Sequence, residues 1–156
     1  MMIQLYQRPG DPVAADILEI ATLLTTDWFT TNVPEDTRRD LLFQDAFCLY
    51  ENGELRSFLV FTSWDGCLHI TLMGTHPDYH GCGYGSRLME RFLQHARDLG
   101  FAKAVALTVP PEVKSAYRAT MAFYRKHGFV ETRCYHELWE NGAVELVKDL
   151  ASTGLE

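Results

Sequence analysis

Two periods of apolar positions alternate along the chain, and they predict its elements. Apolar residues recur every three to four positions in four segments, as at Leu88, Phe92 and Ala96. The predicted helices run from Pro12 to about Trp28, from about Glu35 to Phe43, from about Tyr84 to the stop signal at Gly100, and from Lys114 to His127. The predicted strands are Met2 to Tyr6, two runs around Asn52-Gly53, one run from Asp65-Gly66 to a glycine loop, Ala102 to Val109, Phe129 to Glu137 and Ala143 to Leu150.

Turn residues separate these strands. Asn52-Gly53 and Asp65-Gly66 are typical of two-residue hairpin turns, and Asn141-Gly142 lies between the last two strands. The resulting order is β-α-α-β-β-β-α-β-α-β-β, with no internal repeat or linker. With 156 residues, 47% of them hydrophobic, we expect a single domain over residues 1–156.

Composition limits the class of protein. No run approaches the roughly 18 apolar residues of a membrane span, and the start lacks the features of a signal peptide, so we expect a cytoplasmic protein with no membrane partner. The cysteines are widely spaced without a CxxC pair, which indicates free thiols. A net charge of −7 disfavours nucleic acid as a partner and fits a cationic or neutral substrate.

A glycine-rich loop lies between an apolar strand and the helix that begins near Tyr84. Its glycines stand at positions 81, 83 and 85. Small residues let a ligand approach the backbone, and the unpaired N–H groups and dipole of a helix start favour an anion. The spacing matches neither the GxGxxG dinucleotide fingerprint nor a GK[ST] phosphate loop. We therefore predict a pyrophosphate site of another kind, with a plain tight turn as the alternative.

Three motifs together resemble those of a known family. They are HGCGYGSRLM at residues 80–89, a strand that ends in Pro110-Pro111, and MAFYRKHGFVET at residues 121–132. They are similar to motifs of the GNAT superfamily of acyl-CoA-dependent N-acyltransferases, and the element order over about Ile3 to Leu150 agrees with that family's fold. The resemblance implies an α/β (α+β) fold with a central, mixed, mostly antiparallel sheet of about seven strands flanked by about four helices. It also implies acetyl-CoA as co-substrate and no metal.

The resemblance assigns the cofactor to the glycine loop and to the strand before it. His80 stands where the family has Gln or Arg, and its ring nitrogen can still form a hydrogen bond. Tyr117 stands where many members have asparagine, and Arg87 adds charge at the helix start. The implied cofactor-binding residues are Met73, Thr75, His80, Gly81, Cys82, Gly83, Tyr84, Gly85, Ser86 and Tyr117.

The same resemblance implies how the acyl group moves. A backbone N–H near Met73, Gly74 and Thr75 would polarise the thioester carbonyl. Tyr124 holds the position of the acid that protonates the leaving thiolate, and helix packing is the alternative reading. His69 stands six residues before Thr75, where many members have a glutamate base. A ring that only satisfies a sheet neighbour is the alternative for His69. Weaker candidates for the base are Glu54, Asp65 and Glu137.

The acceptor is the least defined part of the prediction. Family members vary their acceptor pocket in the loop between the first two helices. The opposite wall of that pocket is a second candidate region. The residues concerned are Asp27, Trp28, Asn32, Glu35 and Asp36 on the first side, and Tyr135, His136 and Trp139 on the second. Helix capping and solvation explain them equally well. We predict direct acetyl transfer to a small-molecule or peptide amine in a ternary complex; the alternative is a catalytically silent acyl-CoA-binding or sensor module. A homodimer stays open, because dimers are common among similar proteins.

Overall fold

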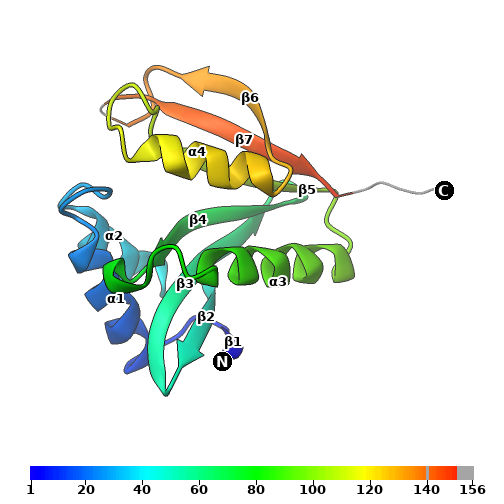
Figure 1. Cartoon of the computed structure of the whole chain (residues 1–156). Helices are drawn as coiled ribbons and strands as arrows, with labels where there is room; N and C mark the ends of the chain where they lie inside the picture. Colours follow the sequence, from blue (N-terminus) through cyan, green and yellow to red (C-terminus); the bar gives the residue numbers. More distant parts are fainter. Residues whose placement is uncertain (140, 151–156) are drawn as a thin grey trace. The chain divides into compact units, whose positions relative to one another are not determined.

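The computed structural model describes residues 1–139 and 141–150. Its strands are β1 (Met2–Tyr6), β2 (Asp45–Glu51), β3 (Glu54–Trp64), β4 (Cys67–Thr75), β5 (Lys103–Thr108), β6 (Val130–Tyr135) and β7 (Ala143–Asp149). Its helices are α1 (Val13–Leu23), α2 (Val33–Asp40), the 3₁₀ helix η1 (Pro77–Tyr79), α3 (Tyr84–Asp98) and α4 (Tyr117–Lys126). The predicted order of seven strands and four α-helices is confirmed for the described residues (Figure 1).

The strands form one mixed sheet in the order β1-β2-β3-β4-β5-β7-β6. The pairs β1–β2, β2–β3, β5–β7 and β6–β7 are antiparallel. By contrast, β4 and β5 run parallel, with Cys67–Ile70 beside Lys103–Ala106. The predicted mixed, mostly antiparallel sheet is therefore confirmed.

Two tight turns connect β2 to β3 and β3 to β4, as predicted. Asn52 and Gly53 have φ angles of 55° and 78°, and Asp65 and Gly66 have 54° and 76°. Positive φ at both central residues is the requirement of the hairpin turn that matches strand twist, and Asn-Gly and Asp-Gly meet it at low cost. These two dipeptides therefore help to fix how β2, β3 and β4 pair with one another.

The helix ends differ from the prediction. The first helix ends at Leu23 instead of near Trp28, because the Thr25 hydroxyl donates to the Thr22 carbonyl at 2.7 Å and competes with helix continuation. The second helix covers Val33–Asp40 instead of 35–43, since Pro34 fits its first turn.

The last helix and hairpin also begin and end differently. Before α4, Tyr117 and Arg118 donate to carbonyls only three residues back, so residues 114–116 form turns instead of a helix. Tyr135 pairs with Ala143, so the described residues 136–139, 141 and 142 lie between β6 and β7 and belong to neither strand. The expected turn at Asn141-Gly142 is therefore only part of a longer loop.

The chain folds into two compact units, of which the first comprises Met1–Thr62 and Thr71–Phe92. Its core contains the predicted apolar face of α1, on which Ile17, Ile20 and Leu24 are at most 3% exposed. This face packs with Phe58 and Val60 of β3. The first unit thus contains β4 from Thr71 onward and the start of α3.

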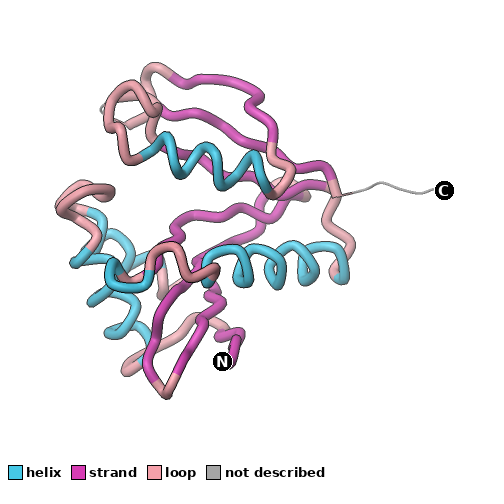
Figure 2. The backbone as a smooth tube through the Cα atoms, viewed as in Figure 1, coloured by secondary structure: helices cyan, strands magenta, loops and turns pink. Residues whose placement is uncertain are grey.

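The second unit comprises Ser63–Ile70 and the chain from Leu93 onward. It contains the strands β5, β6 and β7 and the helix α4 (Figure 2). Met121 of α4 and Leu146 of β7 are buried in it.

In the described part of the chain, no helix combines the length and apolar character needed to cross a membrane. The four cysteines are free thiols, as predicted.

Candidate functional site

The glycine loop leads from the end of β4, through η1, directly into α3 (Figure 2). Gly81 and Gly83 have φ angles of 80° and 83°, in the left-handed region that glycine occupies without strain. The Arg87 N–H donates to the Gly83 carbonyl at 3.2 Å. The amides that precede Arg87 therefore lie at the open end of the helix, where N–H groups have no acceptor within the helix.

The charge at this helix start favours an anion. The first turn of α3 contains no acidic residue, and exposed Arg87 lies at its end. A helix start carries about half a positive charge from its backbone dipoles. Since no carboxylate of the first turn neutralises that charge, the loop can hold a phosphate or pyrophosphate.

His80 closes this loop onto the end of β4. Its Nε2 lies 2.8 Å from the Thr75 carbonyl oxygen, so this nitrogen carries the proton and donates. The His80 ring also meets the Trp28 ring edge-on, with 4.9 Å between centroids. The residue at the Gln or Arg position of the motif thus makes an internal contact, and a contact with a cofactor stays a prediction.

The end of β4 is held tightly against the first unit's core. The fully buried Ser57 hydroxyl lies 3.1 Å from the Gly74 carbonyl oxygen and 2.8 Å from the Thr75 hydroxyl. A Cβ atom on Gly74 would lie 2.7 Å from Leu24 Cδ1 and 3.1 Å from the Phe58 ring. Glycine is needed here because the strand approaches these side chains too closely for a larger residue.

Two consecutive residues of β3 that the sequence did not single out support this region. They are Ser57 and Arg56, and Arg56 is only 7% exposed. The Arg56 guanidinium lies over the ring of Tyr79 in η1. Sequence alone offers no signal for either residue, because Arg-Ser in a strand is ordinarily half exposed and the contacts come from a distant loop.

His69 lies in the part of β4 that belongs to the second unit, opposite Val105 of β5. Its ring centroid is 5.5 Å from that of Trp64. Its Nε2 is buried and has no hydrogen-bond partner among the residues described. Glu54, a weaker candidate for the base, has a 71% exposed side chain and pairs with Arg56.

Helix α4 buries the two predicted tyrosines of the second unit. Tyr117 and Tyr124 are 7% and 6% exposed, on the same helical face as Met121. Burial raises the pKa of Tyr117 to about 12. Burial, and to a lesser extent the neighbouring Tyr117, raises the pKa of Tyr124 above its ordinary value. Both phenols are therefore protonated at neutral pH, as a general acid must be before it reacts.

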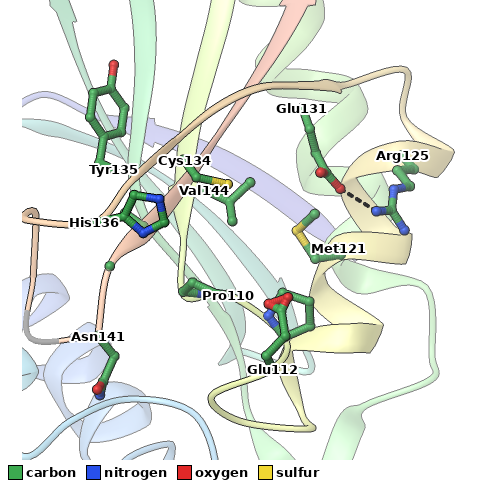
Figure 3. A pocket seen from close by; sticks show the side chains of 13 residues that line it. Pro110, Glu112, Met121, Arg125, Glu131, Cys134, Tyr135, His136, Asn141 and Val144 are labelled. Carbon is green, nitrogen blue, oxygen red and sulfur yellow. Dashed lines mark hydrogen bonds and ion pairs between the residues drawn. The ribbon is translucent and has the colours of Figure 1, made fainter.

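A pocket of about 490 Å³ lies beside α4 in the second unit (Figure 3). Its lining includes Tyr135, the last residue of β6, and His136 directly after it, two of the three residues predicted for an acceptor wall. Arg125 and Glu131 form an ion pair on its side. The remaining lining residues are Pro110, Pro111, Glu112, Met121, Cys134, Asn141, Gly142, Ala143 and Val144.

The predicted site residues thus fall into two groups. Met73, Thr75 and residues 80–86 lie together in the first unit, whereas His69, Tyr117 and Tyr124 belong to the second. Across residues 1–139 and 141–150, no three His, Cys, Asp or Glu side chains gather in a way that could hold a metal ion.

Comparisons with known proteins identify the family. The model of the acetyltransferase (GNAT) family matches residues 15–129. The chain is 28% identical over 144 residues to the L-amino acid N-acyltransferase MnaT of Escherichia coli K12, covering 85% of this chain and 81% of that protein.

Solved structures share the fold. The ribosomal-protein-S18-alanine N-acetyltransferase of Escherichia coli has a TM-score of 0.77 at 16% identity, covering 98% of this chain and 97% of that one. An acetyltransferase of Salmonella typhimurium, solved with its cofactor acetyl-CoA, has a TM-score of 0.69 at 19% identity, covering 100% and 98%. The predicted fold and family are both confirmed: the chain belongs to the acetyltransferase (GNAT) family.

Proposed function

We propose that this protein transfers the acetyl group of acetyl-CoA to the amine of a small molecule, in the first place an amino acid. The observation that carries the cofactor is the left-handed glycine loop that opens onto the acid-free start of α3. The amino acid is proposed from the name of the Escherichia coli relative, an L-amino acid N-acyltransferase. The Salmonella typhimurium structure with acetyl-CoA supports the same cofactor.

In this proposal the residues divide the work of one direct transfer. Amides of the glycine loop hold the pyrophosphate, and Arg87 adds charge. The amine nitrogen attacks the thioester carbonyl carbon while a backbone N–H near Met73 to Thr75 donates to the developing oxyanion. The carbon–sulfur bond then breaks. Tyr124 gives its proton to the leaving thiolate, and His69 accepts the proton that the amine loses.

The acid is tested by Tyr124→Phe. General acid catalysis contributes about 10²- to 10⁴-fold, so kcat with an amino-acid acceptor should fall by at least about 100-fold. The affinity for CoA should change little. Tyr50→Phe is the matched control, because Tyr50 also has a raised pKa and its hydroxyl lies 3.1 Å from the Tyr6 hydroxyl on the β1–β2 pair. Equal activity of both variants would contradict the role of Tyr124.

The pH dependence gives a second test of the same residue. Because the pKa of Tyr124 is raised, its phenol stays protonated well above neutral pH. Ionisation of this phenol should therefore cause no fall in kcat between about pH 7 and pH 9. A fall caused by the phenol would be present in the wild type and absent in Tyr124→Phe. A loss of that kind would mean that the phenol ionises in the working range.

The base is tested separately by His69→Ala. If the rate and its pH profile stay intact, the base is another group, and Glu54, Asp65 and Glu137 are the next residues to substitute.

Release of free thiol from acetyl-CoA with a panel of amines separates transfer from the alternative of a silent binding module. Tight CoA binding without thiol release for any amine would favour that module.

Three broader features belong to the same proposal. Residues 1–156 act as a single domain in the cytoplasm, and the acceptor range extends to peptide amines, while the choice between a monomer and a homodimer stays open. Light scattering of the purified chain and a peptide panel in the thiol assay test the last two.

A further inference from the structure

One positive charge beside the glycine loop is more than nine-tenths buried. Arg56 is 7% exposed, and its Nε is a buried atom without a hydrogen-bond partner in the described residues. Its ionic partner is Glu54 at 3.3 Å, whose side chain is 71% exposed. A buried cation is costly unless other groups compensate it, and an exposed carboxylate compensates it only weakly.

Arg56 also has an aromatic partner. The guanidinium carbon lies 3.7 Å from the centroid of Tyr79, which is the geometry of a cation–π contact. Tyr79 is the last residue of η1, immediately before His80. The Arg56 carbonyl also accepts a hydrogen bond from the His76 N–H at 2.8 Å. Arg56 therefore contacts the turn at both ends, with its backbone at His76 and its side chain at Tyr79.

This turn connects β4 to the glycine loop. Tyr79 is followed by His80, which bonds to Thr75, and then by left-handed Gly81 and Gly83. The Tyr79 ring also lies 6.4 Å, centroid to centroid, from the ring of Tyr84, the first residue of α3. A displaced Tyr79 would thus change both the entry to the loop and its exit.

We propose that Arg56 is a positioning residue for the cofactor: by holding Tyr79, it sets the geometry in which the glycine loop receives the pyrophosphate of CoA. This inference rests on the proposed function, because it takes CoA as the ligand of the loop. Arg56 acts through Tyr79 and needs no contact with the cofactor itself.

The test combines two variants and their double variant. The CoA dissociation constant, measured by calorimetry, should rise about tenfold in Arg56→Met and in Tyr79→Leu, as expected for loss of a desolvated cation–π contact. The CoA dissociation constant of the double variant should be about that of the single variant that binds CoA less tightly, because both substitutions remove the same interaction. Arg56→Lys and Tyr79→Phe keep the cation and the ring, and should restore most of the affinity.

Arg91→Met is the matched control. Arg91 lies on α3 with its guanidinium 5.0 Å from the ring of Phe47, so this variant removes one positive charge and one cation–π contact of the same unit away from the turn. It should leave CoA affinity within about twofold of wild type. Additive losses in the double variant, or an equal loss in Arg91→Met, would overturn the proposal.

Hydrogen exchange of the ligand-free protein separates positioning from direct binding and from general destabilisation. In Arg56→Met and Tyr79→Leu, the hydrogen-bonded amides of His76, Asp78 and Tyr79 should exchange faster, while the β1–β2 ladder keeps its protection. Unchanged exchange in the loop, or equally faster exchange in β1–β2, would contradict positioning. If the wild type binds no CoA, the proposed function fails, and the exchange result still decides whether Arg56 holds the loop.

Discussion

The N-termini of α2 and α3 lie in the same unit but differ in the charge of their first turns. α2 has Glu35 and Asp36 in its first turn, and both pair with arginines of the same helix. α3 has no acidic residue in its first turn and is preceded by two left-handed glycines. The positive charge at the start of α2 is neutralised by the helix's own acidic side chains. The start of α3 has no such side chain, so its positive end can bind an external anion.

This difference explains why only one of the two helix starts is a candidate site. The sequence of α2, VPEDTRRD, supplies the proline, acids and bases that satisfy an eight-residue helix locally. In α3, fifteen residues long, the amphipathic body provides stability through buried Leu88, Met89 and Phe92. Its first turn is therefore free of the need for a stabilising acid.

The largest effect is expected when the first turn of α3 receives an acid like those in the first turn of α2. Gly85→Asp should weaken CoA binding by about 100-fold relative to Gly85→Ala, because a carboxylate would repel the pyrophosphate at close range. The thermal midpoint of Gly85→Asp should not fall below that of Gly85→Ala, since an acid at this end stabilises the helix. Titration calorimetry and thermal melts measure the two effects. Equal CoA affinities of the two variants would contradict an anion site here.

A smaller effect is expected from the loop backbone. Alanine at Gly83 meets no atom within 4 Å of its Cβ, so its cost comes only from the positive φ. That cost is about 1–2 kcal/mol, and relaxation of the loop should weaken CoA binding by about tenfold. Unchanged affinity in Gly83→Ala would mean that the left-handed geometry is not needed for the ligand.

At α2 the matching change should leave binding untouched. Glu35→Gln removes a first-turn acid and its pairing with Arg38 and Arg39. The free energy of unfolding should fall by about 0.5 kcal/mol in a denaturant titration, while CoA affinity stays constant. A clear change in CoA affinity would place the start of α2 near the ligand.

The smallest effect concerns the other end of α2. Partial burial of the carboxyl, and then the nearby Asp36, raise the pKa of Asp40 above its ordinary value. The folded protein therefore binds the proton more readily than the unfolded chain. The free energy of unfolding falls as the pH rises from the ordinary pKa of the aspartate through the raised pKa of Asp40. Asp40→Asn should raise the thermal midpoint slightly at pH 7 and give no gain at about pH 3. A gain that is largest in acid would reverse this sign.

The sequence predicts most of the fold because its signals are local. Asn52-Gly53 and Asp65-Gly66 set hairpin turns through their own backbone preferences, and the spacing of Ile17, Ile20 and Leu24 marks a buried helical face. The end of α1 was missed because threonine hydroxyls bond to nearby carbonyls there, as at Thr25.

The supporting part of the candidate site could not be predicted in the same way. The glycines and the tyrosine-bearing helix follow a motif, but the burial of Arg56 depends on a turn more than twenty residues away folding over it. The contact between Trp28 and His80 likewise joins distant segments. No single-sequence pattern distinguishes such residues from ordinary surface positions.

In the proposed function the loop before α3 holds the CoA pyrophosphate, and amide NMR can locate the ligand at that loop. Addition of CoA should shift the amide resonances of Gly81, Gly83 and Gly85. Gly53 and Gly66, which have similar left-handed φ angles in the β2–β3 and β3–β4 turns, are the internal controls and should not move. Shifts confined to other residues, with the loop glycines unchanged, would contradict the account.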